Sequence, residues 1–248
     1  MARYEFRMQR LFVADDLAPG ATFKLDHHQA HYLLKVLRMS VEDNVLVFNG
    51  RHGEWRAAIA EAGKKQCVVR AIEQIRGQTE PSNLHYLFAP LKQARLDYMV
   101  QKAVEMGVGA LRPVITQHTQ MPKIKMDRVR ANAVEAVEQC GILSLPTVHA
   151  PVKLTDVITN WGMTDSDRRI IFCDEDDEAG DPISVLRDIG QNPLAVLIGP
   201  EGGFSAEERA LLNAQEFVTS MSLGPRILRA DTAAVSALTL VQAVCGDW

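Results

Sequence analysis

Two loops rich in glycine and proline interrupt the second half of the chain, and each lies between an apolar strand and a helix. The first, residues 199–203 (Gly-Pro-Glu-Gly-Gly), follows the apolar run 194–198 and precedes a helical pattern. The second, residues 222–229 (Ser-Leu-Gly-Pro-Arg-Ile-Leu-Arg), follows an expected strand at 217–222 and also precedes a helical pattern. Strands that alternate with helices form a parallel sheet. Ligands of such sheets bind at the carboxyl ends of the strands, where both loops are expected.

The rest of the chain divides into two domains. Apolar runs at 45–48, 55–59 and 67–72 predict short strands, and residues 28–37 have the apolar spacing of one helix face. Segment 76–83 is polar, contains Gly and Pro and lacks periodicity, so we expect a linker there. We therefore expect a first domain at 1–75, a small sheet with one helix, and an α/β domain with a parallel sheet at 84–248. In the second domain the patterns predict strands at 84–89, 111–115, 170–173, 194–198 and 217–222, and helices at 95–106, at 128–140, from 206 and from 232.

The glycine loop (residues 199–203) has the residue types of a ligand-binding turn. Gly199, Gly202 and Gly203 allow the backbone to approach a ligand closely or to adopt a positive φ. Ser205 and Glu208 form a capping-box pattern that fixes the start of the next helix. The loop does not fit the G-x-G-x-x-G dinucleotide pattern, and no Gly-Lys-Ser/Thr follows it, so both nucleotide-binding motifs are excluded. A tight strand-to-helix turn without a ligand fits the same spacing.

The arginine loop (residues 222–229) carries two arginines in a part of the chain that is otherwise acidic, since residues 143–248 hold 7 basic against 16 acidic residues. The planar guanidinium groups of Arg226 and Arg229 suit a phosphate or a developing oxyanion. Pairing with Glu201 or Asp231 is the structural alternative. Glu201 could orient a cofactor or accept a proton, or be only a charge favoured near a helix N-terminus.

Together the two loops resemble the SPOUT superfamily of S-adenosylmethionine-dependent RNA methyltransferases. The signature is Ile198-Gly-Pro-Glu-Gly-Gly-Phe-Ser205 followed by Ser222-Leu-Gly-Pro-Arg-Ile-Leu-Arg-Ala-Asp-Thr-Ala-Ala234. More narrowly, the chain resembles the ribosomal RNA small subunit methyltransferase E family, which methylates N3 of a uridine in 16S RNA. Further matches at residues 10–13, 31–38, 48–50, 89–92, 101–108 and 138–141 extend the resemblance over nearly the whole chain.

The resemblance implies a fold and a cofactor. It implies an N-terminal PUA-like β-barrel for RNA and a C-terminal SPOUT α/β domain with a parallel sheet, whose last segments thread a trefoil knot that binds S-adenosylmethionine. It also implies a homodimer. Carried over by motif, the cofactor contacts are Phe172, Cys173, Ile198, Gly199, Pro200, Glu201, Gly202, Gly203, Ser222, Leu223, Gly224, Ile227 and Leu228.

Catalytic and RNA-binding residues follow from the same resemblance. We expect Arg229 to stabilise negative charge on the uracil oxygens, and Glu201 or Asp231 to act as the base. The expected RNA contacts are Arg10, Arg38, Lys92, Arg95, Lys102 and Arg226. A solvated helix face is the alternative for the basic residues at 92–102. The net charge of −4 does not exclude an RNA partner, because residues 1–142 hold 20 basic against 15 acidic residues.

Three positions depart from the family pattern. Glu42 stands where Gly is more frequent in the turn before Asp43, and Ile142 stands where a basic residue often follows Glu-Gln-Cys-Gly. Asp231 stands where Glu is more frequent. The last substitution shortens a carboxylate side chain by one methylene, which affects any role in proton transfer.

The remaining features favour a cytoplasmic protein without a metal. The first 16 residues lack the apolar core of a secretory signal, and the longest apolar stretch, 232–246, is shorter than the roughly 20 residues needed to cross a bilayer. Four widely separated cysteines indicate buried thiols. His27, His28 and His31 have no ligand partner nearby except Asp26, and the acidic run 174–178 lacks the EF-hand glycine, so no metal site is expected.

The expected partner is 16S ribosomal RNA or the small ribosomal subunit. Two other functions fit the same sequence. One is a SPOUT methyltransferase that acts on another RNA, such as transfer RNA. The other is a non-catalytic RNA-binding factor in ribosome assembly.

Overall fold

The computed structural model describes residues 8–63, 66–174, 180–190 and 192–248. The chain forms two compact units. The first contains the residues up to Pro81 together with Val137–Leu145, and the second contains Ser82–Ala136 and Pro146–Trp248. The break after Pro81 falls inside the segment that was expected to be a linker. The return of 137–145 to the first unit matches no sequence pattern that we recognised. In the described part of the chain, no helix is long and apolar enough to span a membrane.

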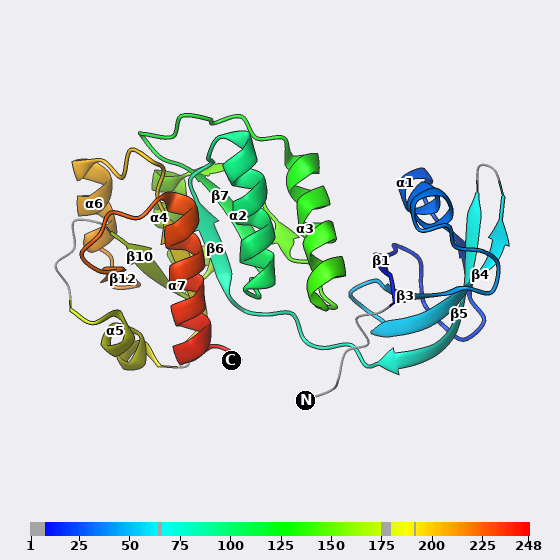
Figure 1. Cartoon of the computed structure of the whole chain (residues 1–248). Helices are drawn as coiled ribbons and strands as arrows, with labels where there is room; N and C mark the ends of the chain where they lie inside the picture. The colour runs from blue at the N-terminus through cyan, green and yellow to red at the C-terminus, as the bar shows by residue number, and fades with distance from the viewer. Residues whose placement is uncertain (1–7, 64–65, 175–179, 191) are drawn as a thin grey trace. The chain divides into compact units, whose positions relative to one another are not determined.

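The first unit is built on a five-stranded sheet with the order β1-β3-β4-β5-β2. β1 runs parallel to β3, and the other neighbours are antiparallel. Leu33, Val45, Ile59 and Val69 are fully buried in its core. The elements, drawn in blue to cyan in Figure 1, are β1 (Arg10–Phe12), β2 (Thr22–Lys24), α1 (His27–His31), the π-helix η1 (Tyr32–Val36), β3 (Asn44–Phe48), β4 (Glu54–Ala62) and β5 (Cys67–Arg76).

The helix expected at 28–37 is confirmed, although its second half is a π-helix. Asp26 caps its start by accepting a hydrogen bond from the Gln29 amide at 2.8 Å. The turn that follows holds Glu42 at a φ of 72°, in the left-handed region. That region favours glycine, which explains why Gly is the more frequent residue there. Glu42 is kept in place by the hydrogen bond from its amide to the Ile59 carbonyl at 2.9 Å.

A buried ion cluster ties β1, β4 and β5 together in the first unit. The Glu54 carboxylate accepts from Arg10 Nε at 2.6 Å and from Arg76 Nε at 2.7 Å. Arg10 also donates to the carbonyls of Val137, Glu138 and Ile142, at the end of helix α3 (Met126–Cys140). Because Arg10 is only 7% exposed and each of its guanidinium nitrogens donates inside the unit, its position argues against the expected RNA contact.

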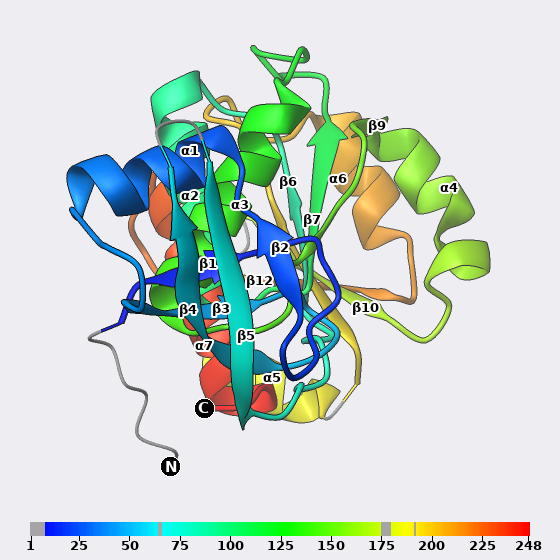
Figure 2. The same ribbon diagram turned by 90° about the vertical axis from the view of Figure 1, so that its right-hand side faces the viewer.

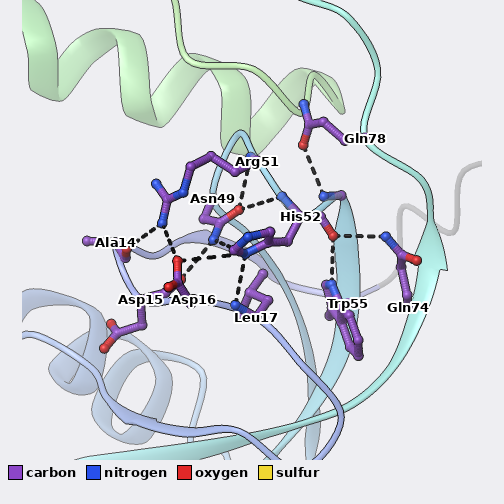
Figure 3. A network of polar contacts seen from close by, with 11 residues as sticks. Ala14, Asp15, Asp16, Leu17, Asn49, Arg51, His52, Trp55, Gln74 and Gln78 are labelled. Carbon is purple, nitrogen blue, oxygen red and sulfur yellow. Dashed lines mark hydrogen bonds and ion pairs between the residues drawn. The ribbon is translucent and has the colours of Figure 1, made fainter.

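The turn at 49–53 anchors the neighbouring loop through side-chain hydrogen bonds (Figure 3). Asn49 donates to the Asp15 carbonyl at 2.8 Å and accepts from the amides of Arg51 and His52. His52 Nδ1 accepts from the Leu17 amide at 3.1 Å. The Phe-Asn-Gly match at 48–50 therefore reflects a structural turn that holds the loop at 14–17 in place.

The second unit is an α/β layer structure, as expected. Its sheet has the order β12-β10-β11-β6-β7-β8, with β9 paired to β7, and every pairing is parallel. In Figure 2, α2 and α7 lie on one side of β6 and β7, and α4 and α6 lie on the other. The elements are β6 (His85–Phe88), α2 (Gln93–Glu105), β7 (Ala110–Ile115), α3 (Met126–Cys140), β8 (Thr147–Val148), β9 (Val152–Lys153), α4 (Leu154–Thr164), β10 (Arg169–Cys173), α5 (Pro182–Ile189), β11 (Leu194–Ile198), α6 (Ala206–Asn213), β12 (Val218–Met221) and α7 (Ala230–Cys245).

The sequence patterns predicted most of these elements and missed four. α4, α5, β8 and β9 were not predicted. β8 and β9 are two residues long, too short to show a period of two. Of the acidic run 174–178, only Asp174 lies among the described residues.

A charged cluster lies near the amino ends of the strands, away from both loops. Asp165 binds Arg112 at 2.8 Å and Arg168 at 3.3 Å, and Arg112 lies 3.4 Å from His85 Nδ1. Burial, with the positive charges of Arg168 and Arg112, lowers the pKa of His85 to about 4. His85 is therefore neutral at pH 7, and this part of the unit is sensitive to acid.

Candidate active site

A cavity of about 340 Å³ opens in the second unit at the carboxyl ends of β10, β11 and β12, between the two loops. Its volume is in the range of small-molecule sites. The cavity brings together most of the residues expected to bind a cofactor: Cys173, Ile198, Gly199, Pro200, Glu201, Gly203, Ser222, Leu223, Gly224, Ile227 and Leu228. It is also lined by Arg95, Arg226 and Arg229.

The glycine loop has the conformation that its residues allow. The Gly203 amide donates to the Pro200 carbonyl at 3.0 Å, which closes a turn, and Gly203 has a φ of 65°. A Cβ at Gly199 would lie 2.5 Å from Phe204 Cε2. Larger residues at these two positions would strain the turn or displace the Phe204 ring from the cavity wall.

The capping box predicted at the start of α6 is confirmed. Ser205 Oγ accepts from the Glu208 amide at 3.2 Å, and Glu208 Oε2 accepts from the Ser205 amide at 3.0 Å. Glu208 is 9% exposed and its Oε1 accepts from the Gln117 amide at 2.8 Å. The helix start is thus fixed both locally and by the segment that follows β7.

The arginine loop leaves its cationic side chains accessible. Gly224 has a φ of 102°, and its amide donates to Ser222 Oγ at 3.3 Å. Arg226 and Arg229 are exposed, and Arg229 occupies the N-cap position of α7. Two guanidinium groups at the cavity edge can therefore meet an anionic substrate without first losing a buried partner.

Two ion pairs flank the cavity. Arg95, at the start of α2, lies 3.3 Å from Glu201 Oε1, and Arg209 lies 3.3 Å from Asp174 Oδ1. Glu201 therefore pairs with Arg95 rather than with an arginine of the arginine loop. Sequence reasoning missed five residues of the cavity wall: Asp174, Phe204, Arg209, Ala230 and Ala233. Asp174 directly follows a strand, and the strand-end rule could have found it.

Two expected cofactor residues do not line the cavity. Phe172 is fully buried and packs edge-to-face on Phe204, with ring centroids 5.0 Å apart. Because side chains alternate along a strand, Phe172 points into the core beneath α4 and α6 while Cys173 reaches the cavity. Gly202 lies against His118 instead.

The other expected site residues outside the cavity are on helices or in the first unit. Asp231 Oδ1 accepts from the Thr232 amide at 3.0 Å in the first turn of α7. Lys102 pairs with Glu105 at 2.6 Å, whereas Lys92 is exposed where α2 begins. Arg38 is exposed in the first unit.

The cysteine in the cavity wall is not a nucleophile. Burial raises the pKa of the Cys173 thiol to about 12. Only a thiolate attacks efficiently, so Cys173 is a wall residue at neutral pH. No disulfide joins any of the four cysteines, all of which lie among the described residues.

Comparison with known proteins assigns this architecture. Residues 78–242 match the model of an RNA methyltransferase domain, and residues 25–72 match that of an RNA methyltransferase PUA domain. Ribosomal RNA small subunit methyltransferase E of Rickettsia conorii is 30% identical over 239 residues, which cover 95% of this chain and 96% of that protein. The chain belongs to the ribosomal RNA small subunit methyltransferase E family.

Two solved structures have the same fold as this chain. A protein of Legionella pneumophila, described as a methyltransferase in complex with S-adenosylmethionine, is 30% identical, with a TM-score of 0.84 over 98% of this chain and 100% of that chain. Ribosomal RNA small subunit methyltransferase E of Neisseria gonorrhoeae has the same fold, with 24% identity and a TM-score of 0.85 over 98% of this chain and 100% of that chain. The first unit is therefore PUA-like, and this chain is an RNA methyltransferase by family.

Proposed function

We propose that this protein uses S-adenosylmethionine to methylate N3 of a uridine in 16S ribosomal RNA. The observation that carries the proposal is the cavity at the carboxyl ends of three strands, which both the glycine loop and the arginine loop line. The substrate class is supported by relatives that match this chain over nearly their whole length and are named ribosomal RNA small subunit methyltransferase E.

The residues of the cavity fit the cofactor. Gly199, Gly203 and Gly224 line the cavity without side chains, which leaves room for an adenosine. The carboxylates of Glu201 and Asp174 line the same cavity and would favour a ligand that carries a sulfonium and an ammonium group. When bound, S-adenosylmethionine supplies the methyl group as an electrophile. We assign its binding to the cavity-lining residues of the two loops and to Cys173.

The chain's own residues prepare the uracil for transfer. Arg229, accessible beside the cavity, would stabilise the negative charge on the uracil oxygens after N3 loses its proton. Of the two carboxylates considered as base, Glu201 lines the cavity whereas Asp231 does not, so we favour Glu201. Because N3 makes a Watson–Crick contact, the target base must be unpaired or extruded.

RNA would be held by the basic residues that are accessible. Arg95 and Arg226 line the cavity, Lys92 lies near the start of α2, and Arg38 belongs to the PUA-like unit. We further propose, from the family resemblance, that the first sheet closes as a barrel, that the cavity loops belong to a trefoil knot, and that the active form is a cytoplasmic homodimer. We leave Arg10 out of the RNA-binding set.

Nucleoside mass mapping tests the function directly. Ribosomal RNA from cells that lack this protein should lose one N3-methyluridine in 16S RNA, and the wild-type protein should restore it. Purified protein should transfer labelled methyl to that 16S RNA and not to transfer RNA. Methylation of transfer RNA instead would indicate a SPOUT enzyme with another substrate, and no binding of S-adenosylmethionine in calorimetry would favour an assembly factor.

Arg229→Ala tests the catalytic assignment. Loss of one positioned cation should lower turnover by about a hundredfold and leave S-adenosylmethionine affinity nearly unchanged. Turnover equal to that of the wild type would remove Arg229 from the mechanism. Arg229→Lys is the matched control, since it keeps the charge and loses the planar fork.

A further inference from the structure

The segment after β7 reaches the glycine loop through one histidine. His118 Nδ1 lies 3.0 Å from the Gly202 carbonyl oxygen and 3.2 Å from the Gly203 carbonyl oxygen. A carbonyl oxygen only accepts hydrogen bonds, so Nδ1 must carry the hydrogen and donate it. The single Nδ1–H is thus shared by two consecutive carbonyls of the loop.

Hydrogen bonds hold the backbone on both sides of His118. The Thr116 amide donates to Thr119 Oγ1 at 2.9 Å, and the Thr119 amide donates back to the Thr116 carbonyl at 3.2 Å. Between them, the Gln117 amide is bound to the nearly buried Glu208 carboxylate, which also forms the capping box of α6. These bonds fix the backbone that carries His118 beside the glycine loop.

The contact sets the orientation of the loop peptides. The described chain contains no cis peptide bond, and in a trans peptide the carbonyl and the N–H point in opposite directions. Because His118 holds the carbonyls of Gly202 and Gly203, the N–H groups of the residues that follow them face the other way. The Gly203 N–H meets Pro200, and Gly203 and Phe204 form part of the cavity wall.

The packing at this contact leaves little room for change. A Cβ at Gly202 would lie 3.3 Å from His118 Cβ, closer than most such contacts in proteins. Glycine at position 202 is therefore explained by the histidine and not by the cavity, which Gly202 does not line. His118, which belongs to neither loop motif, therefore contacts the glycine loop directly.

We propose that His118 is a positioning residue for cofactor binding, which holds the glycine loop in its binding shape through the Nδ1–H bond to two carbonyls. The inference rests on the function proposed above, because S-adenosylmethionine is the ligand of that loop. His118 is not in the cavity wall, so it acts through the loop and not by touching the reacting atoms.

Three variants separate the hydrogen bond from other effects. His118→Ala removes the donor. His118→Asn can place an amide N–H close to the position of Nδ1 and so can restore it. Gln120→Ala is the matched control, because Gln120 is exposed in the same segment. S-adenosylmethionine binding is measured by calorimetry, urea unfolding by fluorescence, and amide exchange of the peptide around Gly203 by mass spectrometry without cofactor.

His118→Ala should weaken S-adenosylmethionine binding roughly three- to tenfold, the range for the loss of one hydrogen bond. Exchange at the glycine loop should become faster while the urea midpoint stays unchanged, because the side chain is exposed. His118→Asn should recover most of the affinity, and Gln120→Ala should behave as wild type.

Unchanged affinity in His118→Ala, or a loss that His118→Asn does not recover, would overturn the positioning role while the proposed function stands. A wild-type protein that fails to bind S-adenosylmethionine would refute the proposed function and this role together. The two failures are distinguishable, because the first shows cofactor binding in the wild type and the second does not.

Discussion

Replacing Glu54 by Gln tests how the PUA-like unit is held together. Glu54 is 2% exposed, and its carboxylate binds Arg10 at 2.6 Å and Arg76 at 2.7 Å. The substitution keeps the shape and removes the negative charge between two guanidinium groups whose side chains are only 7% and 17% exposed. Removal of one partner from a buried ion pair costs about 3–5 kcal/mol. We expect about 3 kcal/mol, at the low end, because Arg10 keeps its three carbonyl acceptors.

A surface pair on the same strands provides the control. Arg56 and Glu73 lie 2.8 Å apart on β4 and β5, with side chains 39% and 56% exposed. Glu73→Gln should cost less than about 1 kcal/mol, since water already screens that pair. The two substitutions thus make the same chemical change at nearly the same distance, and Glu54 differs in being buried and in binding a second arginine.

The assay must report on the first unit alone, because the chain has two units. Amide exchange of peptides from β3, β4 and β5, followed as urea is raised, provides that signal. With a urea dependence of about 1–3 kcal/mol per molar, a loss of about 3 kcal/mol in Glu54→Gln should lower the midpoint by roughly 1–3 M. Equal midpoints for Glu54→Gln and Glu73→Gln would refute the view that burial of this cluster determines its contribution.

Three further changes test separate parts of the molecule. The stability that neutral His85 contributes is complete above the unfolded pKa of 6.5 and is lost as the pH falls toward 4. The free energy of unfolding in urea should therefore fall by about 2 kcal/mol between pH 7 and 5, and His85→Gln should abolish that loss. An unchanged pH profile in the variant would contradict this. Gly109→Ala would put a Cβ 1.7 Å from the Ser82 carbonyl oxygen and should lower the free energy of unfolding in urea by at least about 3 kcal/mol. Gly162 is exposed on α4, and a Cβ there would meet no atom within 4 Å, so Gly162→Ala should stabilise the protein by about 0.5–1 kcal/mol. Glu42→Gly should raise the thermal midpoint by relieving the φ of 72°, and a lower midpoint would show that the Glu42 side chain makes a favourable contribution.

Local chemistry is what the sequence by itself determined. The two loops and the Ser205 capping box depend on residues a few positions apart and were predicted from spacing, and the alternation of strands with helices along the chain predicted the parallel sheet. The glycines at 199 and 203 were also recognised as positions that need backbone freedom. Even the unusual turn at Glu42 showed in the sequence, as a departure from the glycine that its φ of 72° favours.

Long-range pairing is what only the tertiary structure decided. The sequence predicted that Arg10 contacts RNA. In the structure Arg10 is buried and bound to Glu54, 44 positions away. Phe172 and Cys173 are neighbours in the chain, yet the helices packed on each face of the sheet determine which one reaches the cavity. His118 meets a glycine 84 positions later, and no local period encodes such a contact. Spacing records which face a residue shares with its neighbours, whereas the identity of what covers that face depends on how the whole chain folds.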